Sequence, residues 1–247
     1  MSEPGSRRFL TAEWRNLAML NFAIDPGALE SRVPRGTELD AFEGRCYVSV
    51  VGFLFRDTKV FGLPIPFHRN FEEVNLRFYV RRRVGEETRR GVVFVKELVP
   101  RFAIAAAARW LYNENYDAVP MSHEIALDDR GAGRVSYRWG ANGGGGTLGV
   151  KAAGTGTVPG PGSEAGFITE HYWGYVRQLD GSTQEYGVEH RRWRVWQAEE
   201  SELRCDVAAL YGPEFVAALG ARPSSAFLAD GSPVIVMRGR RLGESAR

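Results

Sequence analysis

The chain has 247 residues, of which 44% are hydrophobic and 25% are charged, and its formal net charge at pH 7 is +2. A chain of this length can bury a sizeable core, and its near-neutral charge is unlike that of the strongly basic domains that bind nucleic acids. No apolar run approaches the ~18 residues of a membrane span, and Met1–Arg8 contains no hydrophobic signal core, so we expect a cytoplasmic protein.

Lysine and cysteine are scarce enough to limit the chemistry of the chain. Lys59, Lys96 and Lys151 are the only lysines among 32 basic residues. Cys46 and Cys205 lie far apart, and no Cys-x-x-Cys or His-x-x-x-His spacing predicts a metal site. We therefore expect reduced thiols, no metal and no cofactor.

The first predicted elements are two strands separated by a short helix. Leu17–Ile24 and Cys46–Phe55 are rich in β-branched and aromatic residues, which favour strands. The helix begins at Asp25 and Pro26, because Asp accepts from free N–H groups and proline suits the first turn, and it ends at Pro34.

The next predicted strand, Glu73–Arg82, has two different faces. Glu73, Asn75 and Arg77 alternate with apolar residues, so their side chains share one face at a spacing of ~6.6 Å. A polar face of this kind either meets solvent, as in most antiparallel sheets, or lines a cavity. The residues alone leave both interpretations open.

The strand Val92–Val99 carries two opposite charges on opposite faces. Strict alternation places Lys96 with Phe94 and places Glu97 with Val95. One of the two charges points inward, and alternation does not say which.

A helix is predicted for Phe102–Tyr116, because its alanine run has high helix propensity and a thin face that can lie close to a sheet. The strand Arg134–Trp139 follows, and then the glycine-rich segment Asn142–Gly149. This segment lacks the Gly-Lys-Ser/Thr of a phosphate loop and the spaced glycines of a dinucleotide loop. It therefore predicts a hairpin loop that continues as a strand, and no nucleotide site.

The C-terminal part of the chain is predicted to mix strands with short helices. The helical segments are Ser163–Glu170 and Asp206–Leu219, the second broken at Gly212 and Pro213, and the strands are Tyr172–Gln178, Gln184–His190 and Val234–Arg238.

Aromatic and titratable residues gather between Phe167 and Trp196, and they comprise Glu170, His171, Tyr172, His190, Trp193 and Trp196. Aromatic rings beside titratable groups often line small-molecule pockets, although an aromatic core around a satisfied histidine gives the same pattern. We take Glu170, Tyr172, His190 and Trp193 as candidate ligand-binding residues.

Several segments, taken in order, resemble a known family. They are EGRCYVSVVGFLF, FEEVNLRFYV, GVVFVKELVPRFAIAAAARWLYNENYDAVPM, FITEHYWGYV and VEHRRWRVW. Over about residues 9–242 the chain resembles the YqjF-like family of unknown function, in the acetoacetate decarboxylase-like superfamily.

No linker with a composition shift and no internal repeat divides the chain, so residues 1–247 are expected to form one domain, and the resemblance implies a β-rich α+β fold. The core would be a single closed antiparallel barrel with a ligand cavity and a few covering helices. It also implies that the polar face of Glu73–Tyr79 turns into the cavity. Glu73 would then match the decarboxylase glutamate that lies near the reacting lysine, and Asn75 would lie between this acid and Arg77.

The chain departs from the decarboxylases at the reacting lysine. Those enzymes carry Pro-Lys-Lys just after the helix that corresponds to Phe102–Tyr116, whereas here Pro120 is followed by Met121 and Ser122. A thioether or a hydroxyl cannot form a Schiff base with an oxo acid, so the decarboxylase mechanism is not expected. Met121 is still expected to contact the ligand.

Two functions agree with these features. The first is an enzyme performing lyase-type or acid–base chemistry on a small carbonyl or carboxylate compound, with Glu73 as proton shuttle and Arg77 or Arg109 as anion clamp. The second is a non-catalytic ligand-binding or sensor protein that uses the same cavity. Either way the expected partner is a small molecule, not a nucleic acid or a membrane, and homo-oligomerisation stays open.

Overall fold

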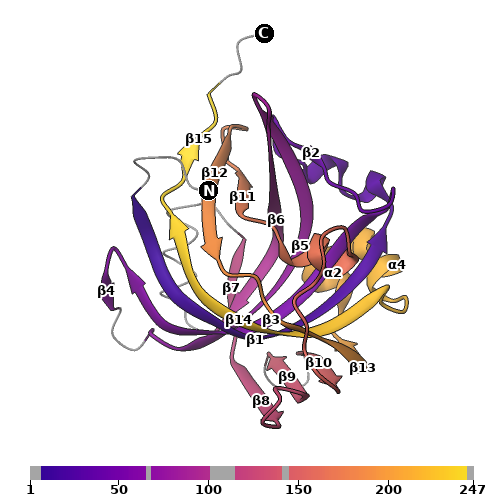
Figure 1. Cartoon of the computed structure of the whole chain (residues 1–247). Coiled ribbons are helices and arrows are strands. Elements are labelled where there is room, and N and C mark those ends of the chain that lie inside the picture. The colour runs from indigo at the N-terminus through magenta and orange to yellow at the C-terminus, as the bar shows by residue number, and fades with distance from the viewer. Residues whose placement is uncertain (1–6, 65–67, 101–114, 141–144, 244–247) are drawn as a thin grey trace.

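The computed structural model describes residues 7–64, 68–100, 115–140 and 145–243, which form a 15-stranded sheet with a few short helices (Figure 1). The main path of the sheet runs through β15 (Arg240–Arg241), β12 (Thr183–His190), β11 (Trp173–Arg177), β6 (Glu87–Val99), β5 (Phe71–Val84), β3 (Cys46–Val60), β1 (Arg8–Ile24), β14 (Ser225–Met237), β13 (Val195–Arg204), β10 (Gly146–Ala152), β9 (Gly133–Trp139) and β8 (Met121–Leu127). Three short strands lie off this path: β2 (Glu38–Leu39) pairs with β5, β4 (Leu63–Pro64) with β3, and β7 (Tyr116–Ala118) with β6.

The sheet is mixed, whereas a purely antiparallel one was expected. β6 pairs in parallel with both β11 and β7, and the other ladders are antiparallel. A short ladder between residues 188–190 of β12 and 234–236 of β14 brings the path β12–β11–β6–β5–β3–β1–β14 back to its first strand. The long strands β1, β3 and β14 curve across the middle of the molecule, and β8, β9 and β10 lie at its lower edge (Figure 1).

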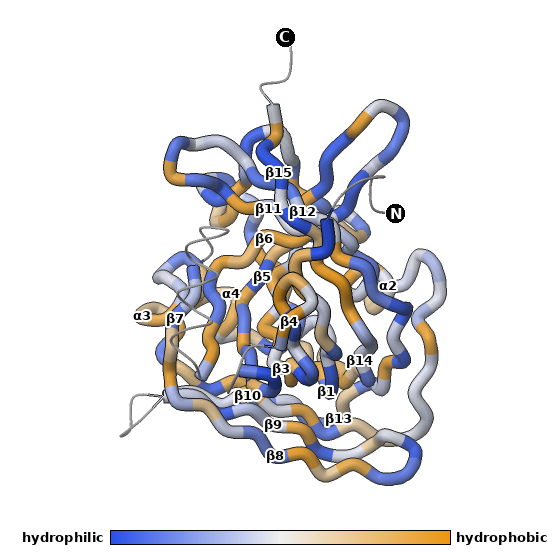
Figure 2. The backbone as a smooth tube through the Cα atoms, turned by 90° about the vertical axis from the view of Figure 1, so that its left-hand side faces the viewer, coloured by the Kyte–Doolittle hydropathy of each residue, from blue (hydrophilic) through white to orange (hydrophobic). Residues whose placement is uncertain are grey.

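The two faces of the long strands pack against different partners. On β5, Leu76 and Phe78 join a core cluster that also contains Tyr137 and Leu148 of the β9–β10 layer. This layer lies at the base of the molecule, below the orange, hydrophobic stretches of β5 and β6 (Figure 2). Gly52 of β3 permits the close contact between the layers, because a Cβ there would lie 2.6 Å from the Tyr137 ring.

A β-bulge in β6 changes the phase of that strand. Arg77 of β5 pairs with Phe94, but the preceding Leu76 pairs with Lys96, so Val95 is an extra residue without a partner position. Val95 therefore interrupts the alternation on which the sequence-based assignment of Lys96 and Glu97 depended.

The short helices begin at the residues that the sequence predicted, but the first predicted helix is two separate 3₁₀ turns that end at Arg32. The Asp25 carboxylate accepts from the Gly27 amide before η1 (Pro26–Ala28) and η2 (Glu30–Arg32). Ser163 caps α2 (Glu164–Thr169), and Asp206 caps α3 (Val207–Tyr211). Gly212, with a φ of 116°, separates α3 from η3 (Pro213–Phe215) and α4 (Val216–Leu219).

The predicted helix Phe102–Tyr116 falls mostly on residues 101–114, outside the described residues. Its last predicted residue is corrected, because Tyr116 begins β7, which pairs in parallel with β6. In the described part of the chain no helix has the length and apolarity to cross a membrane. Cys46 and Cys205 are both free thiols.

A buried ion cluster joins the ends of β5, β6, β12 and β15. The side chain of Glu185 is 0% exposed and pairs with Arg82 at 3.0 Å, Arg89 at 2.9 Å and Arg240 at 2.8 Å. The hydroxyl of Tyr175 donates to the same carboxylate at 3.1 Å. This cluster connects strands that are distant in sequence.

Candidate functional site

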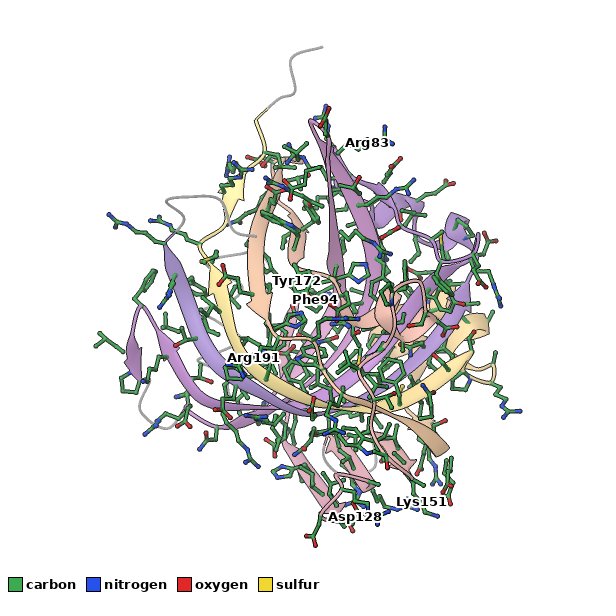
Figure 3. The ribbon with its side chains drawn as sticks, viewed as in Figure 1. Arg83, Phe94, Asp128, Lys151, Tyr172 and Arg191 are labelled. Carbon is green, nitrogen blue, oxygen red and sulfur yellow. The ribbon has the colours of Figure 1, made fainter. Side chains whose placement is uncertain are left out.

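A cavity of about 170 Å³ lies on the inner face of the curved sheet. Side chains of β1, β3, β5, β6, β7, β11, β12 and β14 line it, together with Thr169 at the end of α2. Much of its wall is aromatic, with Trp14, Phe53, Phe55, Phe71, Phe94, Trp173, Tyr186 and Trp193. Figure 3 shows Phe94 in the middle of the molecule, whereas Arg83, Asp128 and Lys151 lie at its margins.

The polar face of β5 lines this cavity, as the resemblance implied. Glu73, Asn75 and Arg77 are 3%, 2% and 8% exposed, respectively, so the face does not meet solvent. Asn75 Nδ2 donates to Glu73 Oε1 at 2.9 Å, which leaves Asn75 Oδ1 as an acceptor without a partner in the described chain. The amide thus orients the carboxylate and still offers an acceptor.

The bulge at Val95 brings Glu97, and not Lys96, into the cavity. Glu97 is 1% exposed and lies opposite Asn75 in the ladder. Lys96 points to the other face, where it pairs with Asp117 at 2.5 Å. One wall of the cavity therefore carries two carboxylates and no lysine.

Tyr116 is the first residue after 101–114 whose side chain enters the cavity. Its hydroxyl donates to Glu73 Oε2 at 3.4 Å. The sequence comparison had placed Met121 and Ser122 at the corresponding lysine positions. Met121, on β8, instead packs against the core cluster that contains Tyr137 and Leu148, and Ser122 is exposed. Since β8 belongs to the β8–β10 layer, neither residue lines the cavity.

Arg77 is a buried cation with an unused donor. Its Nη2 donates to the carbonyl of Ile168 at 3.2 Å, and its guanidinium carbon lies 5.7 Å from the centre of the Tyr79 ring. Its Nε has no hydrogen-bond partner in the described residues. A guanidinium placed in this way suits a carboxylate or another oxyanion.

His171 lines the cavity close to Arg77 and packs on the same Tyr79 ring, at 4.6 Å between ring centres. Its Nε2 lies 3.6 Å from Asp40 Oδ2, and Arg90 Nε donates to that oxygen at 2.6 Å. Burial lowers the pKa of His171 to about 4, although Asp40 opposes the effect, so the imidazole is neutral at pH 7.

His190 also lines the cavity, in a stack of three rings. Tyr172 lies 4.7 Å from one side of the imidazole and Trp193 lies 4.4 Å from the other. Burial lowers the pKa of His190, and its Nδ1 lies 2.9 Å from the carbonyl oxygen of Arg191. Trp193 Nε1 donates to Ser232 Oγ at 3.0 Å, which fixes the outer ring.

The remaining predicted site residues lie behind this lining or outside the described chain. Glu170 accepts from the Tyr172 hydroxyl at 2.5 Å and pairs with Arg192 at 3.3 Å, so Glu170 and Tyr172 support His190 without lining the cavity. Arg109 falls within residues 101–114, outside the described residues. In the described chain no group of three or more His, Cys, Asp or Glu residues is placed to hold a metal.

Tyr116 and Thr169 are lining residues that sequence reasoning missed, and it singled out neither Glu97 nor His171 as a site residue. His171 belongs to the aromatic segment between Phe167 and Trp196. Because side chains two residues apart on a strand share a face, alternation with Trp173 could have placed His171 in the cavity. Nothing in the sequence marks Tyr116, because its position depends on the parallel pairing of β7 with β6.

Solved structures with a similar fold span nearly the whole chain. An acetoacetate decarboxylase-like enzyme from Sphingomonas wittichii RW1 gives a TM-score of 0.65 at 13% identity, covering 96% of this chain and 94% of that one. Acetoacetate decarboxylase from Legionella pneumophila gives 0.66 at 12% identity, covering 98% and 93%. The enduracididine biosynthesis enzyme MppR, complexed with pyruvate, gives 0.63 at 12% identity, covering 99% and 94%. At these identities the likeness shows the fold alone.

At the sequence level, the chain is 31% identical over 81 residues to the uncharacterized protein YqjF of Bacillus subtilis, a match that spans 32% of this chain and 34% of YqjF. A family model described as an uncharacterized conserved protein matches residues 11–233. Because that model covers most of the chain, the chain belongs to the DUF2071 family of uncharacterized conserved proteins.

Proposed function

We propose that the protein binds a small carboxylate or carbonyl compound in this cavity and performs acid–base chemistry on it. Arg77 holds the anionic group of the ligand, and Glu73 transfers a proton. The observation that carries the proposal is the buried Arg77, whose Nε has no partner while its side chain lines a cavity that also contains Glu73. The pyruvate found in MppR, which shares the fold, is a ligand of the same chemical class.

Burying Arg77 Nε without a hydrogen-bond acceptor costs free energy unless a ligand supplies the acceptor. A buried donor without an acceptor costs about 1–3 kcal/mol, and more when the group is charged. Folded proteins keep few such groups, and those that persist call for an explanation. A carboxylate of the ligand would supply the missing acceptors, because its two oxygens can accept from Nε and from the adjacent Nη of the guanidinium.

Glu73 has the position that proton transfer requires. Asn75 and Tyr116 each donate to one of its oxygens, at 2.9 and 3.4 Å, so the carboxylate is held in one orientation within the cavity. Neither donor is a base at neutral pH, which leaves the carboxylate as the proton acceptor of this group.

We extend the proposal to the architecture around the site. The chain acts as one domain and its mixed sheet as a closed barrel, for which the β12–β14 ladder is the supporting observation. The protein works in the cytoplasm, either as a monomer or as a homo-oligomer. Met121, Glu170 and Tyr172 act on the ligand only through the residues that they support.

The test combines ligand-induced melting shifts with turnover assays against oxo acids, aldehydes and aromatic acids. Arg77→Met should abolish the melting shift by carboxylates, whereas the control Arg138→Met should not, because Arg138 pairs with Glu124 at the surface. Glu73→Gln should keep the melting shift and lower turnover by about 10²–10⁴-fold. Carboxylate binding that survives Arg77→Met would refute the assigned anion site.

A non-catalytic sensor is the second candidate, favoured by the fact that none of the three lysines lines the cavity. The chain therefore lacks the covalent electron sink that a Schiff base provides. Binding without turnover, unchanged in Glu73→Gln, would establish this candidate over the enzyme.

A further inference from the structure

Two polar groups without hydrogen-bond partners lie against one aromatic ring of the cavity. Both the Arg77 guanidinium and the His171 imidazole pack on Tyr79, at 5.7 Å and 4.6 Å from the ring centre. In the described chain, Arg77 Nε and both imidazole nitrogens make no hydrogen bond, although His171 Nε2 lies 3.6 Å from Asp40 Oδ2. Both residues line the cavity.

Arg77 requires a hydrogen-bond acceptor, whereas His171 requires a hydrogen-bond donor. Arg77 Nε can only donate a hydrogen bond. His171 Nε2 faces Asp40 Oδ2 at 3.6 Å, and a carboxylate favours the tautomer with the proton on Nε2. Nδ1 is then left as an acceptor.

We propose that the ligand is a hydroxy acid, whose carboxylate accepts from Arg77 and whose hydroxyl donates to the imidazole of His171. This inference rests on the proposed function and names the ligand class of that site. The apolar part of the hydroxy acid lies against the aromatic wall, which includes Phe53, Phe71 and Phe94.

The charges around His171 favour a neutral hydroxyl over an ammonium group. Arg77 on β5 and Arg90 on β6 both act on the imidazole, and Asp40 is the acidic group that opposes them. Asp40 is already engaged by Arg90 at 2.6 Å. An ammonium beside His171 would meet two guanidinium groups and an acid that is already paired, whereas a hydroxyl adds no charge.

Two aromatic rings and one carboxylate hold His171 in place. Tyr79 and Phe167 enclose the ring, with ring centres at 4.6 and 5.3 Å. Arg90 fixes Asp40, which in turn faces the imidazole, so Asp40 is a positioning residue. A ring confined in this way presents the same nitrogen to each ligand.

The experiment measures binding of four compounds with one carbon skeleton to the full chain by titration calorimetry. They are 3-phenylpropanoate, its 2-hydroxy and 3-hydroxy derivatives, and phenylalanine. One hydroxy acid should bind about tenfold more tightly than 3-phenylpropanoate, as expected for one added hydrogen bond to a buried acceptor. Equal affinities of the hydroxy acids and 3-phenylpropanoate, or tighter binding of phenylalanine, would overturn the inference.

His171→Phe keeps the ring between Tyr79 and Phe167 and removes both nitrogens. It should abolish the preference for the hydroxy acid while leaving the affinity for 3-phenylpropanoate unchanged. His123→Phe is the control, since His123 lies on β8 outside the cavity and contacts Glu72. A preference that persists in a folded His171→Phe variant would refute the role of His171, and the wild-type series decides the ligand class if that variant does not fold.

The two proposals fail in different ways. If Arg77→Met abolishes binding of all the acids but the hydroxyl gives no advantage, the hydroxy acid inference is wrong and the carboxylate site stands. If 3-phenylpropan-1-ol binds as tightly as the acids and Arg77→Met changes nothing, the carboxylate site itself is wrong.

Discussion

Replacing Glu185 by glutamine should destabilise the fold strongly, because it removes the anion on which three arginines converge. The side chain of Glu185 is 0% exposed, and Arg89 beside it is 4% exposed. Arg89 also pairs with Glu87, at 3.3 Å, and that carboxylate is 51% exposed. In Glu185→Gln the Arg89 cation would therefore stay buried with its main counter-ion removed.

The size of the loss follows from which arginines can return to water. Removing one partner of a buried ion pair costs about 3–5 kcal/mol. Arg240 is 48% exposed and Arg82 is 19% exposed, so both can regain hydration, and the cost falls mainly on Arg89. We expect the lower end, about 3 kcal/mol, which for a chain of this size lowers Tm by roughly 6–12 °C.

Thermal and urea unfolding followed by circular dichroism would measure this loss. Glu200→Gln is the matched control, because Glu200 pairs with Lys151 at 2.8 Å and Arg134 at 3.2 Å but is 57% exposed. Its Tm should stay unchanged, since exposed ion pairs contribute little. If Glu185→Gln lowers Tm no more than Glu200→Gln does, the argument from buried charge is wrong for this cluster.

Three further outcomes are expected. Burial lowers the pKa of His171 to about 4, against Asp40 and aided by Arg90 and Arg77, so the unfolded imidazole binds its proton first as pH falls from 6.5 to 4. The free energy of unfolding should therefore decrease as pH is lowered from 6.5 to 4, by up to ~3 kcal/mol. Between pH 7 and 4 the Tm should decline less steeply in His171→Phe than in the wild type. Borohydride treatment with acetoacetate or pyruvate should leave the mass unchanged, because Lys96 pairs with Asp117 away from the cavity; a stoichiometric adduct on Lys96, absent in Lys96→Arg, would overturn this. Mass spectrometry without reductant should show Cys46 and Cys205 as free thiols, and a bridge between them would contradict the structure.

Local patterns were sufficient to predict most of the strands and one wall of the site. The alternation of Glu73, Asn75 and Arg77 predicts a shared face because side chains alternate on any regular strand. The same pattern does not distinguish a solvent face from a cavity face. That distinction came from the resemblance to a cavity-bearing fold, and the burial of all three side chains agrees with it.

The parts that sequence could not predict depend on pairing between distant strands. Strict alternation groups Lys96 with Phe94, but the extra residue Val95 in the β5–β6 ladder reverses the faces of Lys96 and Glu97. No side-chain type marks a bulge of this kind. Tyr116 enters the cavity through parallel pairing with β6, whereas matching by residue order pointed to Met121.

Matching a chain to a family by residue order also assumes that the segments between motifs keep their length. Pro120 agreed with the decarboxylase pattern in sequence, yet the residue that follows it lies on β8, outside the cavity lining. A reacting residue therefore has to be identified from the residues that line the cavity. A matching residue nearby in the sequence, such as Pro120, does not identify it.

The aromatic wall of the cavity gives the protein an optical signal of its own. Trp14, Trp173 and Trp193 line the cavity, out of six tryptophans in the chain. Indole emission depends on the polarity around the ring, so a molecule that displaces water from the cavity alters the light emitted by these three residues. Non-absorbing compounds can therefore be screened against the unlabelled protein before any reaction is known.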